Sequence, residues 1–512
     1  MSRNSCRLTR EGERMSSEAL EMVTRKEIEG LMKTVRNLYL ADDIPWVIGY
    51  SGGKDSTATL QLVWLSLKGL SVYRRQKVVH IIHTDTLVES PIVERWASQS
   101  LQKMQEAART DNLPFIVHRL TPSPDQTFWV NLLGRGYPFP RRKYRWCTDR
   151  MKIKPVNDFI KSQISKYGEI ILVLGTRKAE SSRRARTMAH YESKRVRELL
   201  SPNPSLMNEL VFSPISEWTN DDVWLFLMQY RNPWDYSNNE LLSLYRGATA
   251  DNECPLMVSK DLPSCGKSRF GCWMCTIVSK DKSMQAMVNN DPGKQWLSPL
   301  LAFRNMIGDE KSDFSRRSFR KMNGSLQGDG EKLFHGPYKK EIRELWLKQL
   351  LELQQRIREI APSEYRDIEL ISNPELREIR RIWVFDKHEF DDALPRIYAE
   401  VTGDTFVDES WISPSSLTSE EWAMLLETCQ EVAPDKELAF ELAYSLLDIE
   451  ARSQGLNQRK DIFKNLEDAI RRNFYEGEED ATNFYLTRRR REVDADNQVA
   501  IRSLSECKDG ND

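Results

Sequence analysis

The sequence predicts an α/β fold in three parts: a parallel-sheet domain, a cysteine-cluster insertion and a helical C-terminal domain. Three observations predict it. Short apolar runs alternate with amphipathic segments over residues 41–235, four cysteines gather between positions 254 and 275, and helical periodicity dominates residues 337–475. Strands that alternate with helices are typical of βαβ units, in which helices cover both faces of a parallel sheet.

The elements of the first part follow one another in a regular order. Each expected strand is a short, mostly apolar run, and each expected helix places apolar residues three or four positions apart. The strands are expected at 44–50, 78–83, 114–120 and 169–175, and the helices at 17–40, 56–68, 91–109 and 154–167. Thr219 with Asp222 three positions later resembles a capping box, which predicts a further helix there.

Changes in composition divide the chain into six expected segments. They are a helical lead-in (1–40), an α/β domain (41–235), a cysteine-cluster region (236–300), a linker or mobile loop (301–336), a helical domain (337–475) and a charged tail (476–512). The linker is polar and contains glycines, and helical patterns follow it at 341–360 and 436–452. We expect the tail to be loosely structured because it is terminal and highly charged.

Composition excludes several classes of protein. The chain has 512 residues, of which 40% are hydrophobic and 29% charged, so two to four domains with a sizeable core are expected. Lys and Arg (75) nearly balance Asp and Glu (76), so contact with a nucleic acid must use local basic patches. No apolar run reaches ~18 residues, which predicts no membrane span. Without a secretory signal, and with eight cysteines, we expect a cytoplasmic protein whose clustered thiols serve metal or redox chemistry.

Residues 51–57 (SGGKDST) form the most informative run, because they lie between an expected strand and an expected helix. Gly52 and Gly53 allow a tight turn that brings backbone N–H groups to an anion. The following helix adds the positive end of its dipole. Asp55 would repel a phosphate, so we expect it to hold the loop or a Mg²⁺ ion. The run lacks the G-x-x-x-x-G-K-[ST] pattern, which excludes a Walker A loop.

This run resembles the SGGKDS signature of the PP-loop ATP pyrophosphatases, and the chain is most similar to their PAPS-reductase-like branch. GTRKAESS at 175–182 and PISEWTNDDVW at 214–224 also resemble motifs of that branch. The resemblance implies that ATP binds with its pyrophosphate in the loop and is cleaved between the α and β phosphates. It implies that these residues bind the nucleotide and its Mg²⁺: Ser51, Gly52, Gly53, Lys54, Asp55, Ser56, Thr57, Asp85, Gly175 and Arg177.

Four cysteines, spaced C-x10-C-x6-C-x2-C, are candidate metal ligands. They are Cys254, Cys265, Cys272 and Cys275. Four thiolates suit either Zn²⁺ or an iron–sulfur cluster, since both bind sulfur well. Structural zinc sites more often have two C-x2-C pairs, and only one is present, so a [4Fe–4S] cluster is favoured.

Cys147 lies apart from the other cysteines, in a basic run at 141–150 (RRKYRWCTDR). Its cationic neighbours are expected to lower the pKa of the thiol, which suits a persulfide carrier or a nucleophile near a polyanion. A second basic run covers 177–197. Two such patches beside an inferred nucleotide site, in a chain of net charge −1, suggest a polyanionic substrate.

The cysteine block and the helical C-terminal region together resemble the DndC family, the PP-loop component of bacterial DNA phosphorothioation systems. The resemblance implies ATP, Mg²⁺ and a [4Fe–4S] cluster as cofactors, and Lys54, Asp55 and Cys147 as catalytic residues. It implies DNA, a cysteine desulfurase and other subunits of a phosphorothioation complex as partners, and no membrane.

The implied chemistry replaces a non-bridging oxygen of DNA with sulfur. A DNA phosphate attacks the α-phosphorus of ATP, and sulfur from a Cys147 persulfide or from the cluster then displaces AMP. Three alternatives stay open: a sulfonucleotide reductase, a tRNA thiolase, and a nucleotide-gated DNA-binding assembly subunit with a structural cluster. Two observations weigh against the sulfonucleotide reductase. Trp146 precedes Cys147, so the Cys-Cys pair of such reductases is missing, and the C-terminal sequence E-C-G-L-H is missing as well.

Overall fold

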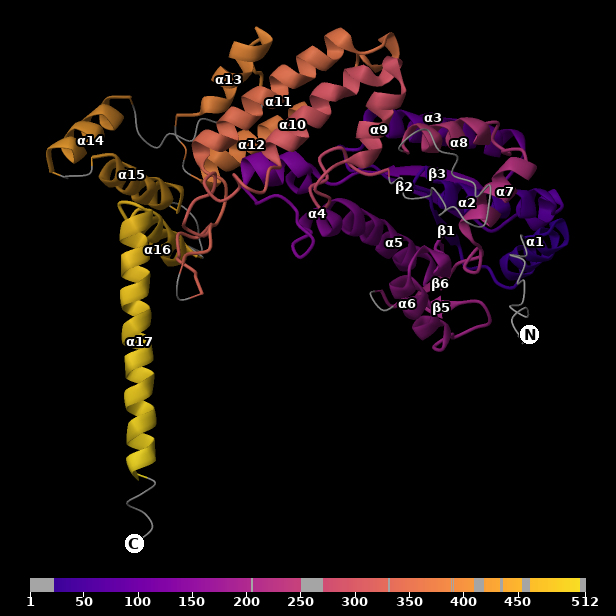
Figure 1. Ribbon diagram of the computed structural model, residues 1–512, viewed down its shortest axis with the longest axis horizontal. Helices are drawn as coiled ribbons and strands as arrows, with labels where there is room; N and C mark the ends of the chain where they lie inside the picture. The colour runs from indigo at the N-terminus through magenta and orange to yellow at the C-terminus, as the bar shows by residue number, and fades with distance from the viewer. Residues whose placement is uncertain are drawn as a thin grey trace, which may run out of the picture. The chain divides into compact units, whose positions relative to one another are not determined.

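The computed structural model describes residues 23–203, 206–249, 270–329, 332–387, 389, 391–408, 419–432, 436–453 and 461–506. The chain forms two compact units, each built from segments that are separated in sequence. The first unit comprises Met1–Thr84, Arg95–Arg119 and Asn157–Arg269, and the second comprises Asp85–Glu94, Leu120–Val156 and Phe270–Asp512. The first unit holds the sheet, and the second is mainly helical (Figure 1).

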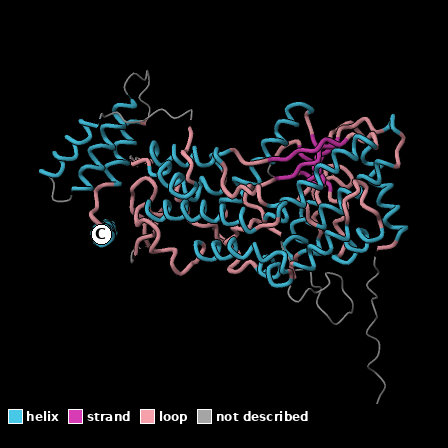
Figure 2. The backbone as a smooth tube through the Cα atoms, turned by 90° about the horizontal axis from the view of Figure 1, so that it is seen from above, coloured by secondary structure: helices cyan, strands magenta, loops and turns pink. Residues whose placement is uncertain are grey.

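A six-stranded, mostly parallel sheet forms the centre of the first unit, with strand order β3-β2-β1-β4-β6-β5. The strands are β1 (Trp46–Gly49), β2 (Val79–Thr84), β3 (Phe115–Leu120), β4 (Ile170–Val173), β5 (Ser201–Pro202) and β6 (Glu209–Phe212). Figure 2 shows them as one magenta group among cyan helices. The register pairs Trp46 with Val79 on one side and with Ile171 on the other, so β1 is central.

The sequence of the central strands explains their burial. Trp46, Val47 and Ile48 of β1 are fully buried, and all four residues of β4 are buried as well. Continuous apolar runs, rather than alternating ones, are expected for parallel strands whose two faces are both covered. The helices of this part are α1 (Arg25–Leu40), α2 (Lys54–Lys68), α3 (Pro91–Thr110), α5 (Lys154–Tyr167), α6 (Ser182–Glu192), α7 (Asn220–Gln229) and α8 (Asn238–Gly247).

The second unit is a set of packed helices with long loops between some of them. In it α11 packs against α10 and α13, and α15 packs against α14 and α16. The bounds are α4 (Trp146–Thr148), α9 (Lys282–Asn290), α10 (Ser298–Ile307), α11 (Lys340–Ile360), α12 (Asn373–Arg381), α13 (Ala393–Thr402), α14 (Ser419–Val432), α15 (Lys436–Ser453), α16 (Ile462–Arg472) and α17 (Glu478–Glu506). Within the described ranges, no helix combines the length and the apolar character that a membrane span requires.

The predicted fold class is confirmed, and several details differ. The first helix begins at Arg25 rather than at 17, and α10 extends to Ile307, inside the segment expected to be a linker. The helix after the glycine loop begins at Lys54 rather than at 56. The pair β5–β6 was not expected, because β5 has two residues and prolines interrupt that stretch. The tail expected to be loose is helical as far as Glu506. Pairs of opposite charge four positions apart, such as Arg488 and Glu492 at 3.0 Å, stabilise a polar helix of this kind.

Candidate functional site

The glycine loop lies where the order of the sheet reverses. From β1 the chain continues to β2 and β3 on one side, whereas β4 and β6 lie on the other. Ligands of open α/β sheets bind outside the carboxyl ends of the strands at such a point. The loop at 50–53 follows the carboxyl end of β1, and Gly175 and Arg177 follow that of β4. The structure thus brings two of the sequence motifs together at adjacent strand ends.

Hydrogen bonds between hydroxyl groups and the backbone hold the loop in shape. Gly52 has a φ of +76°, a left-handed conformation that favours glycine, and Gly53 is the N-cap of α2. The Ser56 hydroxyl donates to the Gly53 carbonyl at 2.9 Å and lies 3.1 Å from the Ser51 hydroxyl. Thr57 donates to the same carbonyl at 2.9 Å. The loop therefore ends at the N-terminus of a 15-residue helix, a suitable place for an anion.

A carboxylate joins the two motifs. Asp55 accepts from Lys54 Nζ at 2.7 Å through Oδ2 and from Arg177 Nε at 2.7 Å through Oδ1. The Arg177 side chain is only 4% exposed and also donates to the Trp218 carbonyl at 3.1 Å. Of the two roles expected for Asp55, holding the loop fits these contacts, because both carboxylate oxygens bind cations of the chain. Burial lowers the pKa of Lys54, and the charge of Asp55 opposes that change.

Gly175 is needed for close approach of the two motifs. A Cβ atom at this position would lie 2.7 Å from the Asp55 carbonyl oxygen and 3.0 Å from the Ser56 amide nitrogen. No real side chain tolerates backbone atoms at that separation, so only glycine fits without moving the first turn of α2. The proximity explains why a glycine precedes Arg177 here.

Tyr245 of α8 also belongs to the site, although it lies in none of the sequence motifs. Its hydroxyl accepts from the Lys54 amide at 3.2 Å, and burial raises the pKa of this fully buried phenol. A Cβ at Gly53 would lie 3.1 Å from the same hydroxyl oxygen. Tyr245 therefore forms one wall of the loop, although no motif includes it and 191 residues separate it from Lys54.

Asp85 belongs to the second unit and follows the last residue of β2. It is 2% exposed, and its Oδ1 accepts from the Leu87 amide at 2.8 Å. Leu87 has a φ of +62°, so this short turn is tightly constrained. The adjacent Thr86 hydroxyl donates to Glu89 at 2.8 Å. The predicted role of Asp85 in nucleotide or Mg²⁺ binding stays a prediction.

Three cysteines of the second unit interact with one another. Cys272 and Cys275 share a hydrogen bond, which lowers the pKa of Cys275 to about 6 and raises that of Cys272. The negative charge of Cys275 also raises the pKa of Cys147. Burial lowers the pKa of Lys152, but Glu89 and the thiols Cys272 and Cys147 outweigh it and raise the pKa overall.

The prediction that the basic run lowers the pKa of Cys147 is wrong. Burial raises the pKa of the Cys147 thiol, and this effect exceeds the lowering by Thr148 and Lys152. The charged neighbours are directed elsewhere: Arg150 donates to Gln126 at 2.8 Å, and Arg141 donates to the Gly308 carbonyl at 3.3 Å. Cys147 also does not stand apart from the cysteine cluster, since it interacts with Cys275.

Buried side chains hold the C-x2-C segment in place. The Trp273 amide donates to the Val88 carbonyl at 2.9 Å, and the indole is 2% exposed beside Trp129 and Phe303. Arg304, which is 3% exposed, donates to the carbonyls of Cys275, Val278 and Ser279, the last at 2.9 Å. One guanidinium thereby fixes the directions of three carbonyl groups at and shortly after the second cysteine.

The donor set agrees in part with a cluster site. Cys272 and Cys275 are close enough to form a hydrogen bond, and soft thiolates are the ligands that an iron–sulfur cluster requires. Cys254 and Cys265 lie outside the described residues. Within the part of the chain that the structure describes, no three His, Cys, Asp or Glu side chains are arranged to hold a metal ion.

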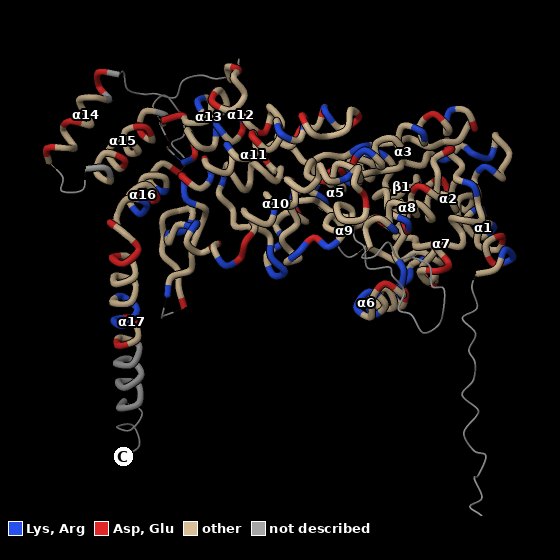
Figure 3. The backbone as a smooth tube through the Cα atoms, turned by 45° about the horizontal axis from the view of Figure 1, so that its top comes forward, with Lys and Arg blue, Asp and Glu red and all other residues tan. Residues whose placement is uncertain are grey.

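The basic runs provide exposed cations on both units. In α6 of the first unit, Arg184 pairs with Glu180 at 2.7 Å, whereas Arg183 and Arg186 are exposed to solvent. Figure 3 shows the blue backbone of this helix. In the second unit, Arg142 and Lys143 are exposed in the turn at 141–144. These side chains are suitable for phosphate contacts, which use exposed Arg and Lys.

Comparison with protein families matches residues 45–278 to the phosphoadenosine phosphosulfate reductase domain. This range of the chain is therefore similar to that domain, and it includes the glycine loop, Cys147 and the C-x2-C pair. Its relatives do not define the activity further.

Two curated relatives, the uncharacterized proteins MJ0066 and MJ0973 of Methanocaldococcus jannaschii, share 26% identity over 244 residues and 24% over 226 residues. The matches cover 48% and 44% of this chain, but 38% and 40% of the relatives. The chain thus spans about two fifths of the length of the curated relatives that it matches.

Two solved structures are also similar. The PAPS reductase of Candida auris, in a phosphate complex, shares 12% identity with a TM-score of 0.24 over 40% of this chain and 87% of its own. The U34-tRNA thiolase NcsA of Methanococcus maripaludis, with its [4Fe-4S] cluster, shares 13% with a TM-score of 0.25 over 56% and 81%. These scores are too low to support a structural comparison.

Proposed function

We propose that the chain is an ATP pyrophosphatase that activates a DNA phosphate for sulfur transfer, as the DndC resemblance implies. One observation carries the proposal most directly: Asp55 joins Lys54 to Arg177 at the carboxyl ends of β1 and β4. In this proposal, the N-terminus of α2 and the two cations act together on one bound anion. A site of this kind suits the charge that develops on departing pyrophosphate.

The first step forms a mixed anhydride. A non-bridging oxygen of DNA attacks the α-phosphorus of ATP, and the bond from that phosphorus to pyrophosphate breaks. Lys54 and Arg177 are positioned for the negative charge that moves onto the leaving group, while Asp55 keeps both cations oriented. Mg²⁺ would enter with the nucleotide and neutralise its phosphate oxygens.

The second step exchanges oxygen for sulfur. The terminal sulfur of a Cys147 persulfide attacks the DNA phosphorus, and AMP leaves with the original oxygen. A thiol from the donor system then cleaves the S–S bond, which leaves P–S⁻ on DNA and a disulfide to be reduced. Cys272 and Cys275, with Cys254 and Cys265, would hold a [4Fe–4S] cluster, which supplies electron transfer when it is bound.

DNA is the proposed acceptor because of the basic surfaces and the family resemblance. Exposed Arg183 and Arg186 on α6, and Arg142 and Lys143 in the second unit, supply local positive charge in a chain of net charge −1. Such patches attract a polyanion without a global basic field. A cysteine desulfurase and further subunits of a phosphorothioation complex are the proposed partners.

The proposal is tested by following labelled sulfur into DNA. The protein, purified without oxygen, is incubated with ATP, Mg²⁺, DNA, a cysteine desulfurase and ³⁵S-cysteine, and the DNA is digested to dinucleotides. We expect labelled phosphorothioate dinucleotides, their loss in Asp55→Asn and Cys147→Ser, and their retention in the control Cys429→Ser. Cys429 lies on α14 and outside the proposed site. Phosphorothioate formation that persists in Cys147→Ser contradicts the persulfide step.

A sulfonucleotide reductase is the second candidate, favoured by the match of residues 45–278 to a PAPS reductase domain. The same preparation, given PAPS and a dithiol reductant in place of ATP and DNA, distinguishes the two. Sulfite release in this assay, with no labelled phosphorothioate in the assay that contains ATP and DNA, supports the reductase and rejects DNA modification. In the assay with ATP and labelled cysteine, label that appears in added tRNA rather than in DNA supports a tRNA thiolase.

A further inference from the structure

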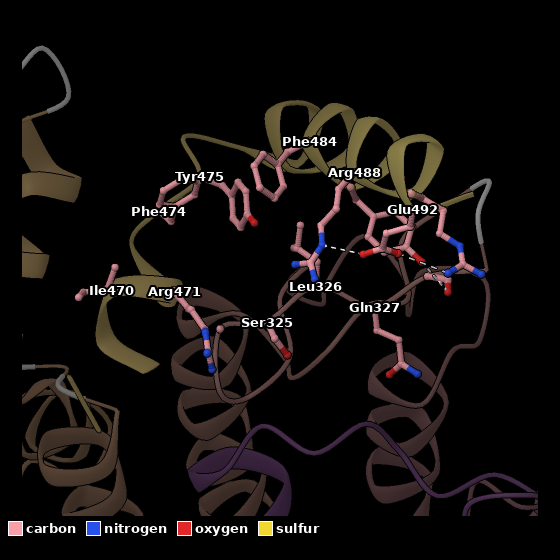
Figure 4. Close-up of a pocket in the computed structure, with 14 residues that line it drawn as sticks. Ser325, Leu326, Gln327, Ile470, Arg471, Phe474, Tyr475, Phe484, Arg488 and Glu492 are labelled. Carbon is pink, nitrogen blue, oxygen red and sulfur yellow. Dashed lines mark hydrogen bonds and ion pairs between the residues drawn. The ribbon is translucent and has the colours of Figure 1, made fainter. Parts of the chain in front are cut away.

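An aromatic and arginine-lined pocket lies in the second unit, outside the proposed catalytic site. It is formed by the end of α16, the start of α17 and the loop at 324–328, and has a volume of about 490 Å³ (Figure 4). Pockets of this volume hold small ligands or single groups of larger ones. None of the motifs in the sequence analysis accounts for it.

Aromatic side chains form one wall of the pocket. The Phe474, Tyr475 and Phe484 rings contact one another with centroids 5.0 to 5.9 Å apart, and Phe474 meets both other rings edge to face. Even so, Phe474 is 57% exposed and Phe484 is 43% exposed. A group of large aromatic rings that gathers at a cavity yet faces water is typical of a binding surface rather than of a core.

Arginines give the pocket its positive charge. Arg471, Arg488 and Arg489 line it, and among the described residues that line it Glu492 is the single carboxylate. Glu492 pairs with Arg488 at 3.0 Å and with Arg489 at 3.5 Å, so one carboxylate serves two cations. The Arg488 and Arg489 side chains remain 70% and 58% exposed, which leaves them accessible to a negatively charged ligand.

The facing loop is shaped to meet the helices. Gly324 has a φ of +78°, and a Cβ there would lie 2.5 Å from the Arg472 amide nitrogen. A Cβ at Gly328 would clash with the chain at Lys332 and lie 3.0 Å from the Tyr485 ring. The Tyr485 hydroxyl donates to the Gly328 carbonyl at 2.9 Å. Two glycines and this hydrogen bond fix the wall opposite the aromatic rings.

We propose that this pocket binds an unstacked base of a single-stranded nucleic acid. The base stacks against Phe484 and Phe474, and its flanking phosphates contact Arg488 and Arg489. Aromatic rings that accept any base, together with cations along a backbone, are the usual means of binding single strands without sequence preference. DNA and RNA share this chemistry. The site needs neither ATP nor the cysteines, so it does not rest on the proposed function.

Binding of 12-residue oligonucleotides to the full chain without ATP tests this proposal. Fluorescence anisotropy compares labelled oligo-dT, oligo-U and a duplex of the same length. We expect at least one of the two single strands to bind more tightly than the duplex. Phe484→Leu and Phe474→Leu should each weaken the binding of that single strand at least fivefold. Phe463→Leu is the matched control, because Phe463 is 80% exposed on α16 and does not line the pocket.

The salt dependence tests the arginines separately. For single strands, log Kd changes with log salt by about 0.7 per phosphate neutralised, so Arg488→Gln with Arg489→Gln should reduce the slope by about 1.4. The control Arg231→Gln, whose pair with Asp235 is also four residues apart and exposed, should leave it unchanged. Unaltered binding by both folded phenylalanine variants, equal binding of the duplex, or no binding at all rejects the site. Loss of ATP turnover has no bearing on these outcomes.

Discussion

Individual residues set the geometry of the glycine loop. Gly175 allows the backbone after β4 to approach the first turn of α2, and Asp55 joins the two motifs electrostatically. The sequence predicts both residues, because each lies in a motif with a strand before it. The sequence does not predict Tyr245, because its position against the Lys54 amide depends on how α8 packs, and the two residues lie 191 positions apart in the chain.

Gly175→Ala is predicted to weaken ATP binding at least tenfold. The added Cβ, 2.7 Å from the Asp55 carbonyl oxygen, displaces either the loop or the start of α2, and with it the aligned N–H groups. Calorimetric titration with ATP and Mg²⁺ measures the effect. Gly30→Ala is the control, since nothing lies within 4 Å of a Cβ there and Ala favours a helix. Unchanged affinity in Gly175→Ala would show that close approach is unimportant.

His80 is predicted to make the stability of the chain pH-dependent. Burial, with the charges of His118 and Lys166, lowers the pKa of His80 to about 4, below the unfolded value of about 6.5. The unfolded state therefore binds the proton more tightly. The stability that the chain has with His80 neutral is fully present above about pH 6.5 and is lost as the pH falls toward 4. The expected loss by pH 5 is about 2 kcal/mol.

Urea unfolding at pH 7 and pH 5 tests the effect of His80. The wild type should lose more stability over this range than His80→Phe, whose ring is compatible with the neighbouring Phe159 at a centroid distance of 5.6 Å. The Nδ1 of His80 lies 3.0 Å from His118, which also has a pKa lowered by burial, so some pH dependence should remain in the variant. Equal losses in the two proteins contradict the assignment to His80.

At the element scale, packing determines features that local pattern does not. The apolar runs of β1 and β4 and the Thr219 capping box are local signals, and the structure has those elements. The two-residue β5 depends on pairing with β6. The charges of α17 suggest a loose tail when only composition is considered, but in the helix they form pairs such as Arg488 with Glu492. The pKa of Cys147 likewise depends on burial, which the basic sequence around it does not indicate.

Arg304→Lys is predicted to destabilise the segment after Cys275. A lysine cannot reproduce the planar guanidinium that donates to three carbonyls, so buried acceptors lose their partners, at a cost of about 3 kcal/mol. We expect a lower Tm and at least a twofold loss of iron per chain after anaerobic purification. Arg358→Lys is the matched control, because Arg358 is exposed and donates to one carbonyl, that of Ile368. Full iron content and Tm in Arg304→Lys would contradict this role.

At the scale of the whole molecule, the chain combines a nucleotide-type loop, a pair of interacting thiols and an aromatic pocket. The first two lie in the range that matches a PAPS reductase domain, whereas the pocket lies beyond it. Sequence motifs predict the sheet domain and its loop because those signals are local and dense. They do not predict the pocket, because its walls come from segments about 150 residues apart that meet only in the folded unit.

The products formed from ATP test most directly whether the loop supports cleavage between the α and β phosphates. Anaerobically purified protein is incubated with ATP, Mg²⁺, DNA and the sulfur donor, and the released phosphate species and nucleotides are quantified. We expect pyrophosphate and AMP in equal amounts, with turnover lowered at least tenfold in Asp55→Asn. Orthophosphate with ADP, or equal turnover in Asp55→Asn, would contradict the proposed cleavage.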